Sequence, residues 1–200
     1  MKGVVEVIST LLISGILIGV VGTVYFWGLP LIQKNKDISV LESNEDFMRE
    51  LDNKIKLVAN AGGREQIQFN QPGVIRFDSV GIRVLIDTEG TIYAAEAPVP
   101  LSRNSPALSQ GVWGVDQPDI ISVLSNHIAD THYRNTFKLN YIPLVVNAQP
   151  APNREFLIKL SGTDSVGGQG SNVIITSEGT SEETFVDKTR VDSIVKIVID

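Results

Sequence analysis

The chain has 200 residues, a net charge of −6, 42% hydrophobic and 20% charged residues, and a mean hydropathy of +0.10. This composition is too apolar for a disordered chain and too charged for a protein with many membrane spans. It contains no cysteine, which excludes disulfides, cysteine-based zinc sites, iron–sulfur clusters and thiol catalysis. The acidic balance argues against nucleic-acid binding, which normally needs a basic face.

The charges are distributed unevenly along the chain. Residues 7–32 carry no charge, whereas residues 33–200 carry 16 of the 17 Lys and Arg and 22 of the 23 Asp and Glu. The net charge of −6 therefore belongs entirely to the second part. These 168 residues are enough for one hydrophobic core, because a domain of about 150 residues buries roughly 68–70% of the surface that its unfolded chain exposes.

The uncharged segment 7–32 has 26 residues, more than the roughly 20 that a helix needs to cross a hydrocarbon core. It ends in the bulky residues Tyr25 to Trp27, unlike the small-residue cleavage site of a secretory signal peptide. These aromatics, with Lys34 and Lys36 after them, resemble the interfacial belt of a membrane span. Lys2 on one side and the two lysines on the other leave the orientation open.

Small residues and one acid mark this segment. Gly15 and Gly19 form a small-xxx-small pair that allows another helix to approach closely, although glycine is also common in ordinary membrane spans. Glu6 lies just before the uncharged run, where a carboxylate is costly in lipid. We expect Glu6 either to meet an amine or to lie among lipid headgroups.

The amino-terminal sequence MKGVVEVISTLLISGILIGVVGTVYFWGLPLI resembles that of archaeal type IV pilin-like proteins and archaellins. The resemblance implies that a prepilin peptidase recognises Lys2 and Gly3 and cleaves before Val4. It also implies that the helix then leaves the membrane and forms the core of a filament, where Glu6 meets the terminal amine of a neighbouring subunit. Cleavage there makes Glu6 the third residue of the mature chain, whereas a glutamate at the fifth is usual in many type IV pilins.

Residues 33–63 have the pattern of an amphipathic connector helix. Phe47, Leu51, Ile55 and Val58 recur every three to four residues, which predicts one apolar stripe packed on the following domain. Ser43 or Asn44 can cap the start of this helix, and Gly62-Gly63 can end it in a left-handed conformation.

From Arg64 onward, short alternating segments rich in Val, Ile, Phe and Tyr predict about nine strands and an all-β, immunoglobulin-like sandwich. We expect a hairpin over Ile82–Ala95, and residues 118–127 are the only candidate for a helix. The last segment, SIVKIVID, predicts a strand that reaches the carboxyl terminus. The loops at Pro98–Gln117 and Ser161–Ser171 are natural places for recognition.

The sequence contains no recognisable catalytic, metal or cofactor motif. His127 and His132, with Asp130 between them, are too few for a metal site by themselves, and the Gly-rich stretch 161–172 lacks the Gly-Lys-Ser/Thr of a phosphate loop. Trp113 is either a core residue or an exposed anchor for a partner. A catalytic carboxylate pair could be drawn from several acids, but nothing selects one; these are Asp116, Asp119, Asp130 and Asp164.

We therefore expect a lollipop architecture with a leader at 1–3, an apolar helix at 4–32, a connector helix at 33–63 and an extracellular β-sandwich at 64–200. The predicted function is a major or minor structural subunit of an archaeal type IV pilus-like filament at the cell surface, with no enzymatic activity and no cofactor. Its partners are other pilins, the prepilin peptidase and the membrane. Two alternatives remain open: a permanently anchored binding or stator-like module, and an anchored hydrolytic enzyme.

Overall fold

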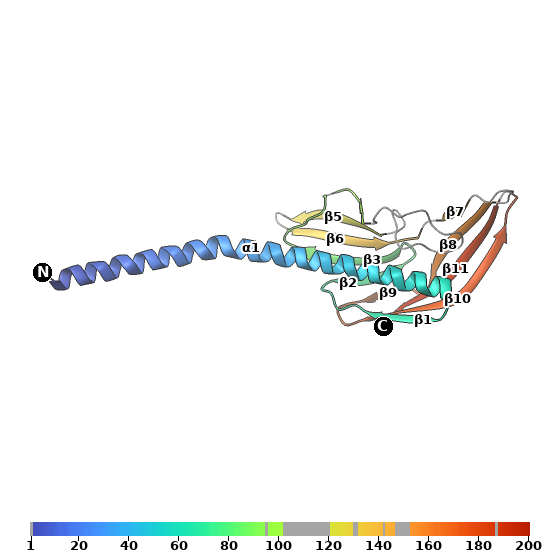
Figure 1. Ribbon diagram of the computed structural model, residues 1–200, viewed down its shortest axis with the longest axis horizontal. Helices are drawn as coiled ribbons and strands as arrows, with labels where there is room; N and C mark the ends of the chain where they lie inside the picture. Colours follow the sequence, from blue (N-terminus) through green and yellow to red (C-terminus); the bar gives the residue numbers. More distant parts are fainter. Residues whose placement is uncertain are drawn as a thin grey trace.

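The protein consists of one long helix whose second half lies on two β-sheets (Figure 1). Helix α1 (Lys2–Ala61) has 60 residues, and the amino-terminal half projects away from the sheets. We call residues 7–32 the stem, and the two sheets together with residues 37–61 the head. The computed structural model describes residues 2–94, 96–101, 121–129, 132–141, 143–146, 153–186 and 188–200.

Helix α1 is continuous through the position where the sequence predicted a second helix to begin. The expected cap at Ser43 or Asn44 is wrong: the Asn44 side chain is buried and donates to the Val40 carbonyl at 2.8 Å. Pro30 lies inside the helix and lacks an amide proton, and the helix axis bends gently near the head (Figure 1). At 1.5 Å per residue the helix is about 90 Å long.

The predicted end of the helix at Gly62-Gly63 is confirmed. Both glycines have positive φ, 75° and 91°, and the Gly62 amide donates to the Val58 carbonyl at 2.9 Å. Glycine takes this left-handed conformation without the steric penalty of a Cβ, so the chain can leave the helix and enter the first strand directly.

The first sheet has five strands in the order β1-β10-β11-β8-β7. All of its neighbouring strands are antiparallel except β8 and β11, which are parallel. The strands are β1 (Arg64–Gln68), β7 (Leu144–Val146), β8 (Asn153–Ser161), β10 (Asn172–Thr184) and β11 (Lys188–Ile199). The predicted carboxyl-terminal strand is therefore confirmed, because β11 is the middle strand of this sheet.

The second sheet has six strands in the order β4-β5-β6-β3-β2-β9, all antiparallel. The strands are β2 (Val74–Asp78), β3 (Gly81–Thr88), β4 (Val99–Pro100), β5 (Ile121–Ala129), β6 (His132–Leu139) and β9 (Ser165–Gly167). The Gly-rich stretch 161–172 thus contributes a short edge strand. The two sheets and the helix confirm the coarse prediction of a helix followed by a β-rich domain.

Two local predictions in the second sheet are wrong. The expected hairpin over Ile82–Ala95 does not form, because β3 pairs with β2 and β6 instead, and the tight turn is at Ser79-Val80 with Gly81 at a φ of 119°. Residues 121–127 form a strand rather than a helix. In β5, Ile121, Val123 and Ser125 are buried at every second position, which is the period of a strand.

The core lies between the apolar stripe of α1 and the strands beneath it. The stripe was predicted correctly at Phe47, Leu51, Ile55 and Val58, all of which are buried. Phe47 meets Phe69 edge to face, with ring centroids 5.0 Å apart. The fully buried large side chains come from the helix and from both sheets; they are Leu41, Met48, Leu51, Ile55, Phe69, Ile75, Ile82, Phe137, Leu139, Ile175 and Ile197.

Candidate functional site

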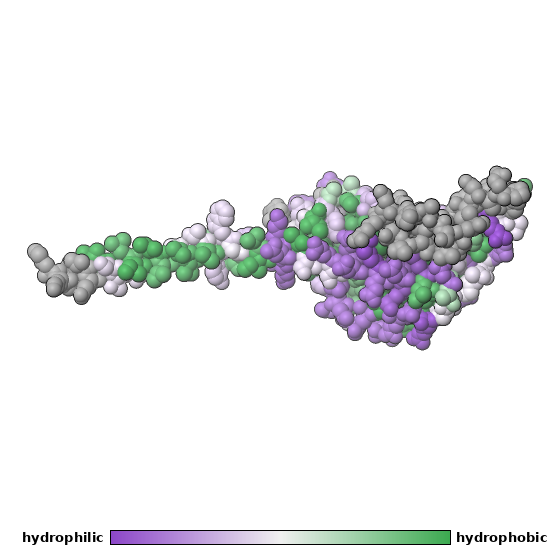
Figure 2. Space-filling view, viewed as in Figure 1, coloured by the Kyte–Doolittle hydropathy of each residue, from purple (hydrophilic) through white to green (hydrophobic). Residues whose placement is uncertain are grey.

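The stem presents apolar side chains to its surroundings on every face. Its large hydrophobic residues are between 52% and 82% exposed, and Figure 2 shows a mostly hydrophobic rod, interrupted by a paler stretch, outside a largely hydrophilic head. The helix is long and apolar enough to cross a membrane, and none of the most apolar window is buried within the chain. Such a surface is stable in water only when lipid or other apolar side chains cover it.

Glycines line one face of the stem. Gly15, Gly19 and Gly22 follow one another at spacings of four and three residues, which places them on the same side of an α-helix. A Cβ added at any of the three would meet nothing within 4 Å. Around Gly15 the missing side chain leaves a shallow hollow lined by Ile8, Leu11, Leu12 and Ile16.

The predicted processing residues lie at the start of α1. The helix begins at Lys2 and continues through Gly3, Val4 and Glu6. The structure does not describe the side chains of these residues. The pairing of Glu6 with an amine therefore stays a prediction.

A buried polar cluster ties the second half of α1 to the head. Lys56 Nζ lies 2.6 Å from Asp52 Oδ2, and the Tyr141 hydroxyl donates to Asp52 Oδ1 at 2.7 Å. All three residues are at most 7% exposed. Burial, and then the neighbouring Asp52 charge, raise the pKa of Tyr141 well above its usual value. The cluster fixes the rotation of the helix, because a buried charge is tolerated only when its partners are in place.

A loop between β3 and β4 fastens α1 where the helix enters the head. We call residues 88–93 the strap. The Gly90 amide donates to Asp37 Oδ2 at 3.0 Å, and the Tyr93 hydroxyl donates to Glu45 Oε2 at 3.2 Å. Burial, followed by the Glu45 charge, raises the pKa of Tyr93. The strap thus contacts the helix two turns apart.

Buried side chains of the second sheet hold the strap in place. Asn135 Nδ2 donates to Thr88 Oγ1 at 2.8 Å, and Thr91 Oγ1 donates to Asn135 Oδ1 at 3.0 Å. Ser125 also donates to Asn135 Oδ1. Ser125 and Asn135 are fully buried, so this network connects the core of the sheet to a loop on the surface.

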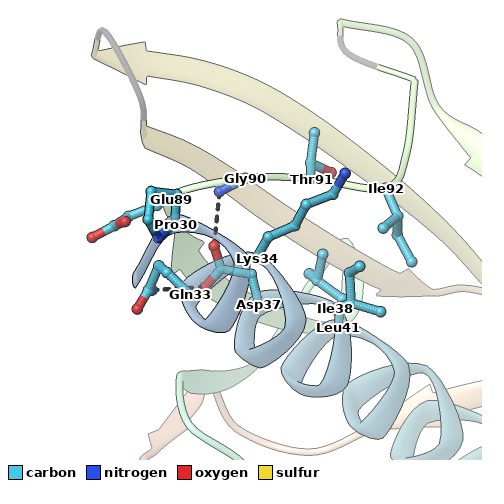
Figure 3. A pocket seen from close by; sticks show the side chains of 10 residues that line it. All are labelled: Pro30, Gln33, Lys34, Asp37, Ile38, Leu41, Glu89, Gly90, Thr91 and Ile92. Carbon is cyan, nitrogen blue, oxygen red and sulfur yellow. Dashed lines mark hydrogen bonds between the residues drawn. The ribbon is translucent and has the colours of Figure 1, made fainter. Parts of the chain in front are cut away.

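A cavity of about 340 Å³ lies where α1 and the strap meet (Figure 3). We call it the base groove. The Ile92 side chain lies above Ile38 and Leu41 (Figure 3). The Lys34 side chain extends along the groove towards Thr91. The sequence did not predict this groove, because it depends on a hydrogen bond between residues 53 positions apart.

The other candidate residues do not form a recognisable site among the residues that the structure describes. His127 and His132 lie on neighbouring strands, where the His127 ring contacts Tyr133, and no group of three or more potential metal ligands occurs in the described ranges. Asp164 lines a cavity of about 340 Å³ together with Asp78, whose carboxylate is bonded to Arg83. Trp113, Asp116, Asp119 and Asp130 lie outside the described residues.

In comparisons with known proteins, no family model, no curated protein and no solved structure matches the chain.

Proposed function

We propose that the protein is a structural subunit of an archaeal type IV pilus-like surface filament. The stems of many copies form the filament core, and the heads, with an immunoglobulin-like sandwich, face outward. The observation that carries this proposal is the division of one continuous helix into an exposed apolar half and a half embedded in the head. A rod of this kind holds the head at a fixed distance from whatever covers the stem.

The stem is long enough both for a precursor that spans the membrane and for a subunit packed in a filament. Its 26 uncharged residues are about 39 Å long as a helix, which is enough to cross a hydrocarbon core of about 30 Å. The same surface suits a bundle of identical helices, because it is apolar on every side. The precursor would thus wait in the membrane and exchange lipid contacts for contacts with other stems.

The glycine face favours helix packing over a purely lipid-facing role. Each glycine in a helix interior costs roughly 0.5–1 kcal/mol relative to alanine. Gly15, Gly19 and Gly22 gain no contact within the chain that would offset this cost. Close approach of a second helix supplies such a contact, because packing between membrane helices favours small residues at the interface.

A permanently anchored binding or stator-like module is the alternative. Its helix would stay in lipid, and its head would act beside the membrane with no filament. The exposed apolar surface of the stem fits this role too, whereas a helix that stays in lipid leaves the cost of its glycines without a compensating contact. The two hypotheses also differ in processing and in the location of the chain.

Intact mass spectrometry of material sheared from cells, without detergent, separates the two hypotheses. The filament hypothesis predicts a chain that begins at Val4, and it predicts that Gly3→Ile leaves the uncut chain in the membrane fraction. Gly28→Ala is a matched control, because a Cβ added at Gly28 would meet nothing within 4 Å and the position is distant from the cleavage point; its chain is expected in the sheared fraction. A chain that is found only in the membrane, with residues 1–3 still attached, contradicts the filament hypothesis.

A further inference from the structure

We propose that the tip of the β10–β11 hairpin of one copy docks into the base groove of the next copy. This inference rests on the proposed filament and names one contact within it. The hairpin tip consists of residues 182–186 and Lys188. The partner surface is a second copy of the same chain.

The hairpin tip presents two exposed apolar side chains at the far end of the molecule. Strands β10 and β11 extend to the end of the head opposite the amino terminus (Figure 1). The Phe185 amide donates to the Lys188 carbonyl at 2.8 Å, which closes a tight turn. In this turn Val186 is fully exposed and Phe185 is 41% exposed. These two neighbouring side chains form a small apolar surface that a second copy can cover.

The base groove is an apolar recess at the opposite end of the head. Pro30, Ile38, Leu41 and Ile92 line it, and Ile92 is 46% exposed. Its volume of about 340 Å³ is within the range of roughly 300–1,000 Å³ that holds small ligands, and is therefore large enough for an apolar side chain. Its walls are fixed by the strap, whose Gly90 bonds to Asp37.

Carboxylates at the tip complement a lysine beside the groove. At the tip, Lys188 lies 3.0 Å from Glu155, and Arg190 pairs with Asp192 at 2.7 Å. Among the residues that the structure describes, these contacts leave the exposed carboxylates of Glu182 and Glu183 without an ion-pair partner.

At the groove the basic group is the exposed Lys34, whose ammonium extends along the opening (Figure 3). The Asp37 carboxylate accepts hydrogen bonds from Gly90 and Gln33, and the Glu89 carboxylate points away from Lys34 (Figure 3). Glu182 of one copy therefore finds an available cation beside the groove of the next.

The positions of the two surfaces determine what kind of assembly follows. A contact between different surfaces at opposite ends of a subunit is heterologous, and it produces an open chain of subunits when the rotation does not close. The docked tip would add a contact between neighbouring heads, on the outside of the filament, to the contacts between the stems.

Cysteine cross-linking in sheared filaments tests this contact cleanly, because the chain contains no cysteine of its own. The full chain carrying Val186→Cys and Ile92→Cys is treated with a short bismaleimide, and we expect a ladder of covalent dimers, trimers and larger products. Each single-cysteine chain can join at most two copies, so it gives no product above a dimer. Val186→Cys with Val166→Cys is the matched control, since Val166 is 57% exposed on another edge, and we expect no ladder.

The outcomes separate this inference from the proposed function. If the double variant forms filaments but gives no ladder, the docking contact is overturned and the filament proposal stands. A ladder of equal extent in the control has the same meaning. If wild-type cells shed no filaments, both proposals fail. If only the cysteine variant fails to assemble, charge reversal decides: Glu182→Lys and Lys34→Glu should each lower filament yield severalfold, and their combination should restore it. A combination that yields no more than the single variants overturns the contact.

Discussion

The two halves of α1 share one helix but have opposite surroundings. In the stem, large apolar side chains are at least 52% exposed, whereas Leu41, Met48, Leu51 and Ile55 in the head are completely buried. The head half therefore obtains its stability from contacts within the chain. The stem obtains its stability only from lipid or from other copies. Substitutions in the two halves should accordingly affect different measurements, namely unfolding of the head and assembly of the stem.

The largest expected effect on the head comes from its buried ion pair. Lys56→Met removes the charge that lies 2.6 Å from Asp52, and we expect a loss of about 3–5 kcal/mol in the free energy of unfolding. Lys54→Met is the matched control. Its partner Glu65 is on the surface, so we expect a change of about 0–1 kcal/mol. Urea unfolding of the full chain in detergent measures the stability of both variants. Equal losses would contradict the conclusion that the Lys56–Asp52 pair is buried and the Lys54–Glu65 pair is not.

The apolar stripe of the head half gives the next largest effect. Leu51 is fully buried, so Leu51→Ala should destabilise the head by about 2–5 kcal/mol. Leu57, six residues later on the same helix, is 52% exposed, and Leu57→Ala should change stability by no more than about 0.5 kcal/mol. If both variants unfold at the same urea concentration, the stripe does not form the core.

The hydroxyl of Tyr141 should have an intermediate effect. Tyr141→Phe leaves Asp52 Oδ1 without this donor in a buried site, which should cost about 1–3 kcal/mol. Folding raises the pKa of Tyr141. The contribution of the neutral hydroxyl to the free energy of unfolding is therefore complete below the usual tyrosine pKa of about 10, and it is lost as the pH rises above that value. Unfolding titrations between pH 8 and pH 11 should thus show a weaker alkaline loss for the variant, and an unchanged loss would contradict this role.

Substitutions in the stem should change filament assembly and leave the stability of the head unchanged. Gly19→Ala should stabilise the isolated helix by roughly 0.5–1 kcal/mol, while the added methyl group hinders close helix packing. We expect fewer filaments on the cell surface and unchanged unfolding of the head. Ile18→Leu, a neighbouring exposed substitution of similar volume, is the control. A Gly19→Ala variant with normal filaments would weaken the packing argument.

The smallest expected effect is on the surface of the head. Two hydrogen bonds of 2.8 Å from Arg134 hold the pKa of Asp87 below its usual value. The ion pair therefore adds to the free energy of unfolding above the usual aspartate pKa, and this addition is lost as the pH falls through the pKa of Asp87 in the folded protein. Both side chains are about half exposed, so Asp87→Asn should cost less than about 1 kcal/mol at neutral pH. Stability curves of the two chains should converge in acid; curves that diverge there would contradict this linkage.

Much of the helix could be predicted from the sequence, because the patterns that indicate a helix repeat every three to four residues and depend on near neighbours in the chain. The run without charges and the stripe at Phe47, Leu51, Ile55 and Val58 identified both halves, and Gly62-Gly63 marked the end. Ser43 and Asn44 were misleading, since a residue that is a good cap stays inside a helix when the helix already continues through it.

The sheets and the base groove were harder to predict because they depend on distant contacts. The alternating pattern predicts a hairpin over Ile82–Ala95, but Gly90 in the middle of this range belongs to the strap, and its amide donates a hydrogen bond to Asp37 on the helix. Residues 118–127 were considered as a helix, although Ile121 and Val123 alternate as buried strand residues. The groove exists only after strap and helix meet, so no local pattern could reveal it.

The most direct test of the filament account is an electron cryomicroscopy reconstruction of material sheared from the cell surface without detergent. The account predicts filaments in which residues 7–32 of neighbouring copies are packed together, with Gly15 and Gly19 at helix contacts and the heads outside. It would be contradicted if filaments in that material lacked this chain at their core, or if the chain were found only as single copies whose stems remain in lipid.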